Sequence, residues 1–175
     1  MKKFVSIVVI TVLFIIHQSL AAQENYVANK LFYTELGGAG VIMSANFDGR
    51  FIAQSRLGLG YRIGAGFGVG RFDRGDDYGV RRTYYTIPVG LNYVLGKPNK
   101  SSTFEVGGTV TYLTRKVSLY NYDVYKLGNF IGMLSFMYRM MPVDGGFTFR
   151  AGFTPIIGTA GDLYPMVAVG FGYAF

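Results

Sequence analysis

The chain ends in the run Val167-Ala168-Val169-Gly170-Phe171-Gly172-Tyr173-Ala174-Phe175, where bulky apolar residues alternate with glycine or alanine. Alternate side chains of a β-strand point to opposite faces. One face of this strand is therefore apolar and aromatic, and the other carries almost no side chain. A soluble strand places polar groups outside, and this run has none. The pattern is typical of a membrane strand with lipid on one side and a crowded barrel lumen on the other.

Two further segments repeat this design. In 84–95 the apolar face begins and ends with Tyr85 and Tyr93, and in 104–114 it begins and ends with Phe104 and Tyr112. Each aromatic pair is separated by eight residues. At about 3.3 Å per residue and a tilt of about 40°, this separation spans roughly 20 Å of depth, close to the apolar band of a membrane barrel.

The same alternation, which is less clean in 41–51, completes the strand set. It marks the segments 41–51, 57–69, 130–140 and 147–157, which brings the count to seven strands. Antiparallel closure needs an eighth, and 26–36 is the candidate, turning at 37–40, although Lys30 and Glu35 interrupt its pattern. We therefore predict an all-β, membrane-spanning, up-and-down antiparallel barrel of eight strands, in which the first strand has the weakest pattern.

The connections sort by length in the order that such a barrel requires. Short periplasmic turns alternate with longer outer loops in barrels of this kind. The predicted short turns are 52–56, 96–102 and 142–146, and the predicted longer loops are 70–82, 115–128 and 158–164. The main rival is a soluble ligand carrier of lipocalin type. It would turn the bulky faces inward, where an eight-stranded barrel has too little room for them.

The first 22 residues have the features of a cleaved secretory signal peptide. Lys2 and Lys3 precede an apolar run over 4–16, and the small residues Ala21 and Ala22 offer a cleavage site. The alternative is an uncleaved anchor, but a membrane helix takes about 20 apolar residues. We predict that residues 23–175 form one outer-membrane barrel domain of a Gram-negative-type envelope.

Composition narrows the range of partners. Aromatic residues make up 17% of the chain and cysteine is absent, so no disulfide framework is expected. The net charge is +7, but the sequence contains no basic stripe interleaved with aromatic residues. Nucleic acid is therefore not expected as a partner. The basic residues near the predicted outer interface are candidates for contacts with lipid phosphates; they are Arg81, Arg82, Arg115 and Lys116.

With these features, the chain resembles the small eight-stranded outer-membrane barrels of the OmpA and OmpX type. The resemblance rests on the strand pattern, the length and the ending Phe171-x-Tyr173-x-Phe175, which looks like the signal read by the barrel-assembly machinery. The chain departs from OmpA because it has no periplasmic peptidoglycan-binding domain, so no wall-anchoring role is carried over. Roles differ widely among such barrels, and the fold does not choose between them.

The residue inventory argues against an enzyme. The one histidine is His17, inside the predicted signal peptide, and there is no cysteine. The mature chain therefore lacks the usual general base, thiol nucleophiles and most ligands for transition metals. We predict no catalytic residue, no metal site and no cofactor.

Charged residues on the predicted inner faces form the most informative group. They are Arg62, Glu105, Arg139 and Arg150, with Glu35 as a further candidate. A buried charge without a partner is costly, so these residues are expected to form an ion-pair network that fills the lumen. The alternative is a narrow polar path for small solutes, for which the glycine-rich face of 58–68 would provide space.

The sequence thus predicts a non-enzymatic outer-membrane barrel with a filled lumen. Its expected partners are outer-membrane lipids, the barrel-assembly machinery and, through the outer loops, an extracellular protein or lipopolysaccharide. The outer loops would then serve surface interaction or envelope integrity. A narrow channel and a lipid-modifying envelope enzyme without histidine are the alternative functions.

Overall fold

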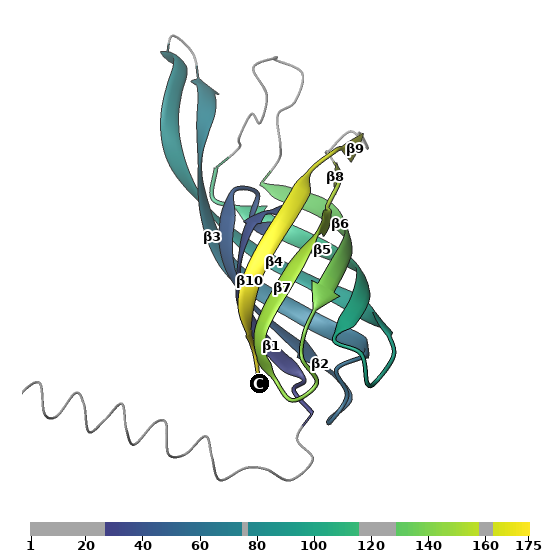
Figure 1. Ribbon diagram of the computed structural model, residues 1–175. Helices are drawn as coiled ribbons and strands as arrows, with labels where there is room; N and C mark the ends of the chain where they lie inside the picture. The colour runs from purple at the N-terminus through teal and green to yellow at the C-terminus, as the bar shows by residue number, and fades with distance from the viewer. Residues whose placement is uncertain (1–26, 75–76, 116–128, 158–162) are drawn as a thin grey trace, which may run out of the picture.

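The computed structural model describes residues 27–74, 77–115, 129–157 and 163–175, which form a closed antiparallel β-barrel (Figure 1). Each long strand pairs with its neighbours in the chain, and β10 closes the ring by pairing with β1. The predicted eight-stranded barrel is therefore confirmed. The elements are β1 Lys30–Gly37, the 3-10 turn η1 Gly38–Gly40, β2 Met43–Arg50, β3 Gly58–Arg74, β4 Asp77–Gly96, β5 Ser102–Leu113, β6 Phe130–Met140, β7 Gly146–Phe153, β8 Ile156–Ile157, β9 Leu163–Tyr164 and β10 Val167–Ala174.

The first strand, which has the weakest sequence pattern, takes its place as the seam of the barrel. Phe32 pairs with Phe47 of β2 on one side and with Tyr173 of β10 on the other. Glu35 is buried on the inner face of β1, whereas Lys30 is exposed. The two charged residues thus fit the strand, because they point to opposite sides of the barrel wall.

Proline residues explain where the ladder is interrupted. Strand β8 continues β7 in the same register after Pro155, and β10 continues β9 after Pro165. Within the β3–β4 ladder, pairing skips the two positions opposite Pro88 and Ile87 and then resumes in register. Proline has no N–H to donate, so each proline removes one ladder hydrogen bond without shifting the strands.

The prediction of a loop over 70–82 is wrong. Strands β3 and β4 continue as far as Arg74 and Asp77, and together they project beyond the rest of the barrel as a two-stranded ribbon (Figure 1). Outside the bilayer the hydrogen-bond ladder alone is enough to maintain a hairpin, so no apolar alternation is needed there. The predicted short turns are found between β2 and β3, β4 and β5, and β6 and β7.

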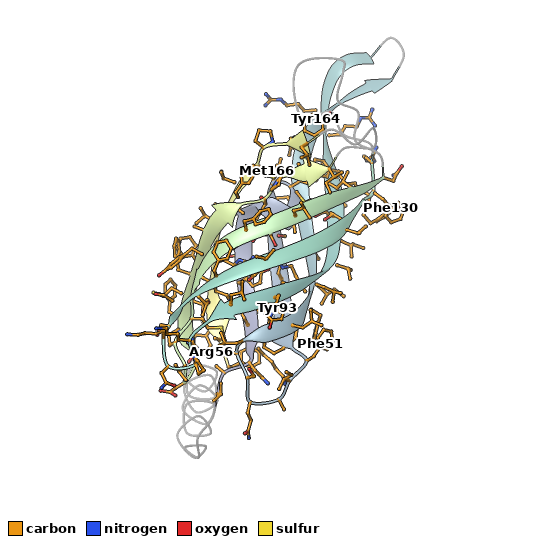
Figure 2. The ribbon with its side chains drawn as sticks, turned by 90° about the vertical axis from the view of Figure 1, so that its right-hand side faces the viewer. Phe51, Arg56, Tyr93, Phe130, Tyr164 and Met166 are labelled. Atoms are coloured by element: carbon orange, nitrogen blue, oxygen red, sulfur yellow. The ribbon has the colours of Figure 1, made fainter. Side chains whose placement is uncertain are left out.

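The outer wall is apolar all round, as the strand patterns predict. Val89, halfway between Tyr85 and Tyr93 on β4, leaves half of its surface exposed, as do Leu91 and its neighbours along the band. Figure 2 shows the side chains projecting outward round the barrel. An exposed apolar surface of this extent is stable only against hydrocarbon, which identifies the wall as lipid-facing.

The glycine face of β3 does not form an open path. A Cβ atom placed at Gly60 would lie 2.2 Å from Cζ of Arg50, and one at Gly64 would lie 2.3 Å from Oδ1 of Asn46. One at Gly68 would lie 2.5 Å from the hydroxyl of Tyr84. The space that these glycines leave is therefore filled by side chains from the adjacent strands β2 and β4.

We expect Gly172→Ala to destabilise the barrel by about 1–3 kcal/mol, because an added methyl group overpacks the wall. Its Cβ would lie 2.2 Å from the carbonyl oxygen of Phe32 and 2.4 Å from Cβ of Tyr33. Gly108→Ala is the matched control, since a Cβ there meets no atom within 4 Å. Urea unfolding in detergent micelles measures both variants, and equal stabilities would contradict the prediction.

Candidate functional site

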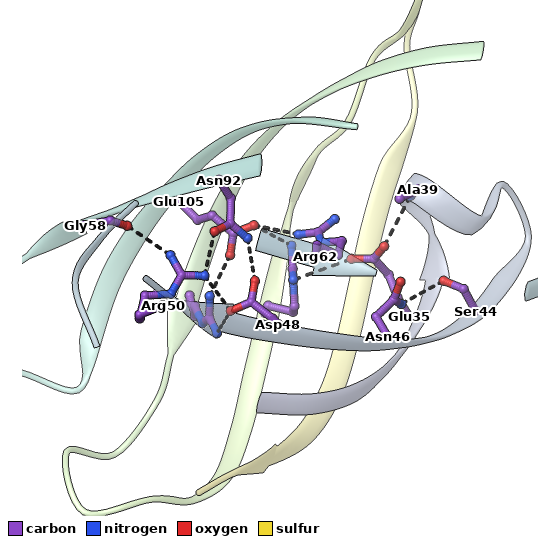
Figure 3. A network of polar contacts seen from close by, with 12 residues as sticks. Glu35, Ala39, Ser44, Asn46, Asp48, Arg50, Gly58, Arg62, Asn92 and Glu105 are labelled. Carbon is purple, nitrogen blue, oxygen red and sulfur yellow. Dashed lines mark hydrogen bonds and ion pairs between the residues drawn. The ribbon is translucent and has the colours of Figure 1, made fainter. Parts of the chain in front are cut away.

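Glu105 is the centre of a charged cluster inside the barrel (Figure 3). Its Oε1 accepts hydrogen bonds from Nη2 of Arg62 at 2.6 Å and from Nη2 of Arg150 at 2.9 Å. Its Oε2 accepts a bond from Nη1 of Arg139 at 3.0 Å. All four side chains are buried. The four lumen residues that the sequence indicates, from strands β3, β5, β6 and β7, therefore lie together.

Asp48 forms a second centre that the sequence reasoning left out of the network. Its Oδ1 accepts bonds from Arg50 at 2.5 Å and from Arg139 at 2.9 Å, and its Oδ2 accepts one from the amide of Asn92. Arg139 bridges the two centres, because it bonds both Asp48 and Glu105. The sequence signal was present, since Asp48 and Arg50 share the polar face of 41–51.

Glu35 connects the network to the first turn of the chain. Its Oε1 lies 3.5 Å from Nε of Arg150, and its Oε2 accepts a bond from the N–H of Ala39 at 3.2 Å. Ala39 belongs to η1, which is buried and folds into the lumen. The hydroxyl of Thr111 donates to the carbonyl of Ala39 at 2.8 Å and holds the turn there.

The inward turn contains a strained residue. Val41 has φ 72° and ψ −61°, and the N–H of Ile42 donates to the carbonyl of Gly40 at 3.0 Å, which closes a γ-turn. A β-branched residue rarely adopts positive φ, so surrounding contacts must compensate for the cost. Val41 is buried in an apolar cluster, and this burial supplies such contacts.

Apolar clusters flank the polar network at both ends of the lumen. One cluster lies at the end of the barrel from which the β3–β4 ribbon projects, here called the loop end. It comprises Ala39, Val41, Tyr84, Leu113, Ile131, Met133 and Ile156, with Tyr164 and Met166 packed against it (Figure 2). The opposite end, where the short β2–β3, β4–β5 and β6–β7 turns lie, is the turn end. Its cluster comprises Ala28, Leu31, Tyr33, Met141 and Ala174. The charged centre is thus separated from both mouths by apolar side chains.

Arg56 connects the three short turns at the turn end of the barrel through hydrogen bonds (Figure 2). From the β2–β3 turn it donates to the carbonyls of Pro98 at 3.2 Å and Lys97 at 3.1 Å, in the β4–β5 turn. It also donates to the carbonyl of Met141 at 2.6 Å, next to the β6–β7 turn. Burial lowers the pKa of the Arg56 guanidinium from its ordinary value, and the charge of Arg139 acts in the same direction. The sequence reasoning missed this residue, because a lone arginine in a turn has no distinguishing pattern.

We expect Arg56→Met to lower the free energy of unfolding by about 1–3 kcal/mol, because three backbone carbonyls lose their donor. Arg56→Lys should recover part of the loss, since an ammonium group cannot reach all three carbonyls at once. Lys97→Met changes an exposed side chain in the same region and serves as the control. Urea unfolding in micelles gives the ranking, and an Arg56→Met variant as stable as the control would contradict it.

The candidates for lipid-phosphate contacts fall into two groups. Arg81 and Arg82 are exposed on the projecting part of β4, and Arg115 is exposed just after β5. Lys116 lies outside the described residues. Arg81, Arg82 and Arg115 thus lie beyond the apolar band, at the end of the barrel from which the β3–β4 ribbon projects.

The residues proposed as the assembly signal are placed on the lipid-facing side of the last strand. Phe171 and Tyr173 are exposed, and Phe171 packs against Phe149 with ring centroids 5.4 Å apart. Phe175 closes the seam through backbone hydrogen bonds with Lys30 in both directions. The signal peptide predicted for residues 1–22 lies outside the described residues and stays a prediction.

No group of three or more histidine, cysteine or acidic side chains is arranged to hold a metal ion in the part of the chain that the structure describes. Among the same residues, no helix has the length and apolar character needed to cross a membrane.

Comparisons with known proteins add little beyond this geometry. No protein-family model matches the chain, and no curated protein matches it. Among solved structures, it matches the N-terminal beta-barrel domain of Pseudomonas aeruginosa OprF with 12% sequence identity and a TM-score of 0.49, over 85% of this chain and 96% of that one. The closed ring of eight antiparallel strands, apolar outside and charged within, gives the chain the fold of the small membrane barrels of the OmpA and OmpX type.

Proposed function

We propose that the protein is a non-enzymatic outer-membrane barrel that recognises an extracellular partner through its projecting β3–β4 ribbon. The open edges of this ribbon support the proposal. Strand β2 pairs with β3 only as far as Phe67, and β5 pairs with β4 only from Thr86 onward. Between these points and the ribbon tip, β3 and β4 pair with each other, and none of the described strands pairs with either outer edge.

Open strand edges favour a partner that binds as an additional strand. The backbone of Tyr85 faces β5, because its carbonyl accepts a bond from the N–H of Thr114 at 3.1 Å. Two residues further out, Thr83 directs its N–H and C=O to the same side, where β5 has ended. The chemistry therefore fits an extended segment of an extracellular protein, bound mainly through its main chain.

A paired variant tests the recognition role. Thr83→Pro removes an edge donor without removing a bond of the β3–β4 ladder, whereas Thr83→Val keeps that donor. Proteoliposomes carrying each form are incubated with a mixture of extracellular-matrix proteins, and bound proteins are identified by mass spectrometry. We expect a partner that binds the wild type and Thr83→Val but not Thr83→Pro. Binding that persists in Thr83→Pro, or no binding by any form, would argue against recognition through the edge of the ribbon.

The filled lumen favours this role over that of a channel. Ion pairs occupy its middle and apolar clusters lie at both ends. Conductance in planar bilayers tests the alternative, and we expect no ion-sized current steps from the wild type. Steps that are abolished by Gly64→Leu, which fills the lumen further, would establish a channel instead.

Arg81 and Arg82 are proposed as contacts for the phosphates of outer-membrane lipids, because both are exposed and basic on the loop side. An enzymatic role is the remaining alternative, and incubation with outer-membrane lipids followed by mass spectrometry tests it. The appearance of modified lipid would overturn the non-enzymatic assignment.

A further inference from the structure

Two arginines lie on the part of β4 whose outer edge is open, just beyond the end of β5. Arg81 and Arg82 are both exposed, and neither forms an ion pair with a side chain that the structure describes. Successive residues of a strand point to opposite faces. Arg82 therefore lies on the face of the buried Tyr84, and Arg81 lies on the face of the exposed Tyr85. The open edge thus carries one positive charge on each face of the ribbon.

Strand β3 does not supply a counter-charge directly opposite either arginine. In the β3–β4 register, Arg71 lies opposite Arg81, and Gly70 lies opposite Arg82. Like charges directly opposite each other destabilise a strand pair, whereas opposite charges stabilise it. Nearer the tip, Arg74 is opposite Asp77, so a complementary pair is found there but not at Arg81. Acidic side chains on a strand added at the outer edge of β4 would supply what β3 lacks.

We propose that the partner of the ribbon is an extended acidic segment that places two adjacent carboxylate side chains opposite Arg81 and Arg82. The inference rests on the proposed addition of a strand at Thr83. Adjacent residues of the added strand point to opposite faces, so one carboxylate reaches each arginine. Carboxylates form strong, paired hydrogen bonds with guanidinium groups. The same arginines are proposed as contacts for lipid phosphates, so the acidic segment would replace phosphate by carboxylate.

The same charges select against other partners and distinguish the two edges of the ribbon. A basic segment on β4 would place like charges beside both arginines, which is unfavourable. The open edge of β3 begins after Phe67 with Gly68, Val69 and Gly70, none of which is charged. Selection for acidic residues is therefore a property of the β4 edge.

Three synthetic peptides test this selection. Each has the form Thr-Val-Thr-X-X-Thr-Val-Thr, where X is glutamate, glutamine or lysine, and each reads the same in both directions. Fluorescence anisotropy measures binding of the labelled peptides to the full mature chain in micelles of a non-ionic detergent. We expect the glutamate peptide to bind about tenfold more tightly than the glutamine peptide, because two opposite-charge pairs are gained, and the lysine peptide to bind most weakly. In about 1 M sodium chloride the three affinities should converge, because exposed charges are screened.

Charge reversal on the ribbon provides the matched variant. Arg81→Glu combined with Arg82→Glu should bind the lysine peptide more tightly than the glutamate peptide. Lys97→Glu combined with Lys100→Glu changes the net charge by the same amount at two exposed positions of the turn end. This control should keep the wild-type order of affinities.

The outcomes separate this inference from the proposed function on which it rests. If the wild type binds all three peptides equally and Thr83→Pro binds none, strand addition is correct and the acidic partner is wrong. If Thr83→Pro binds the glutamate peptide as tightly as the wild type does, strand addition itself is wrong. The inference is also overturned if the wild type binds no peptide, or if the arginine-reversed form keeps the wild-type order. Complete loss of glutamate-peptide binding in phosphatidylglycerol vesicles would assign the arginines to lipid instead.

Discussion

Glu105→Gln is expected to lower the free energy of unfolding by about 3–5 kcal/mol, the usual cost of breaking a buried ion pair by removing one partner. The substitution keeps the shape of the side chain but removes the charge that Arg62, Arg139 and Arg150 share. Three buried guanidinium groups would then depend on Asp48 and Glu35 alone. Among the described residues, no other side chain takes part in as many ion pairs.

Urea unfolding in detergent micelles, followed by circular dichroism, measures this loss. Ser135→Ala is the matched control, because Ser135 is also buried on the lumen side and its hydroxyl has no partner among the described residues. Should Glu105→Gln fail to refold, Glu105→Asp retains the charge on a shorter side chain and should show an intermediate loss. A Glu105→Gln barrel as stable as the Ser135→Ala barrel would show that the network contributes nothing to stability.

Val89→Arg is expected to destabilise the folded protein by about 2–4 kcal/mol, the cost of an arginine facing lipid at the bilayer midplane. Val89 lies halfway along β4 between Tyr85 and Tyr93, and its cross-strand partner is the equally exposed Val110. Val110→Arg should therefore cost a similar amount. The loss arises because a guanidinium group at this depth must leave water.

The same substitution outside the band provides the control. Asn99 is exposed in the β4–β5 turn, and Asn99→Arg should leave stability nearly unchanged. Refolding into lipid vesicles and titration with guanidinium chloride rank the three variants. If Val89→Arg proved as harmless as Asn99→Arg, the outer wall would face water and the assignment of inside and outside would be reversed.

The lipid-facing half of the barrel was predictable from sequence because hydrocarbon imposes one strict rule. Every outward position along 84–95 must be apolar, so the period of two is clean. The lumen imposes no such rule, since charged, polar and apolar side chains all fit there when they are paired. Asp48 and Arg50 were therefore missed as members of the network, although their segment was recognised as a strand.

Two features had no local signature strong enough to predict. The β3–β4 ribbon leaves the membrane and with it the need for apolar alternation, so residues 70–82 were expected to be a loop. The first turn was placed correctly at 37–40, but its inward fold was not foreseen. The segment from Gly37 to Ile42 contains no polar side chain that would favour water, which is consistent with its inward fold.

The buried position of that first turn limits how the protein can be seen or modified from outside. In the proposed orientation an antibody or a phage that approaches the cell would meet the ribbon, whereas Ala39 and Val41 are packed like core residues. A peptide tag inserted between Gly38 and Gly40 would therefore displace the buried turn η1 from the lumen and remove Val41 from its apolar cluster. The junction between Arg74 and Asp77, at the far end of the ribbon, is the better place to display foreign sequence.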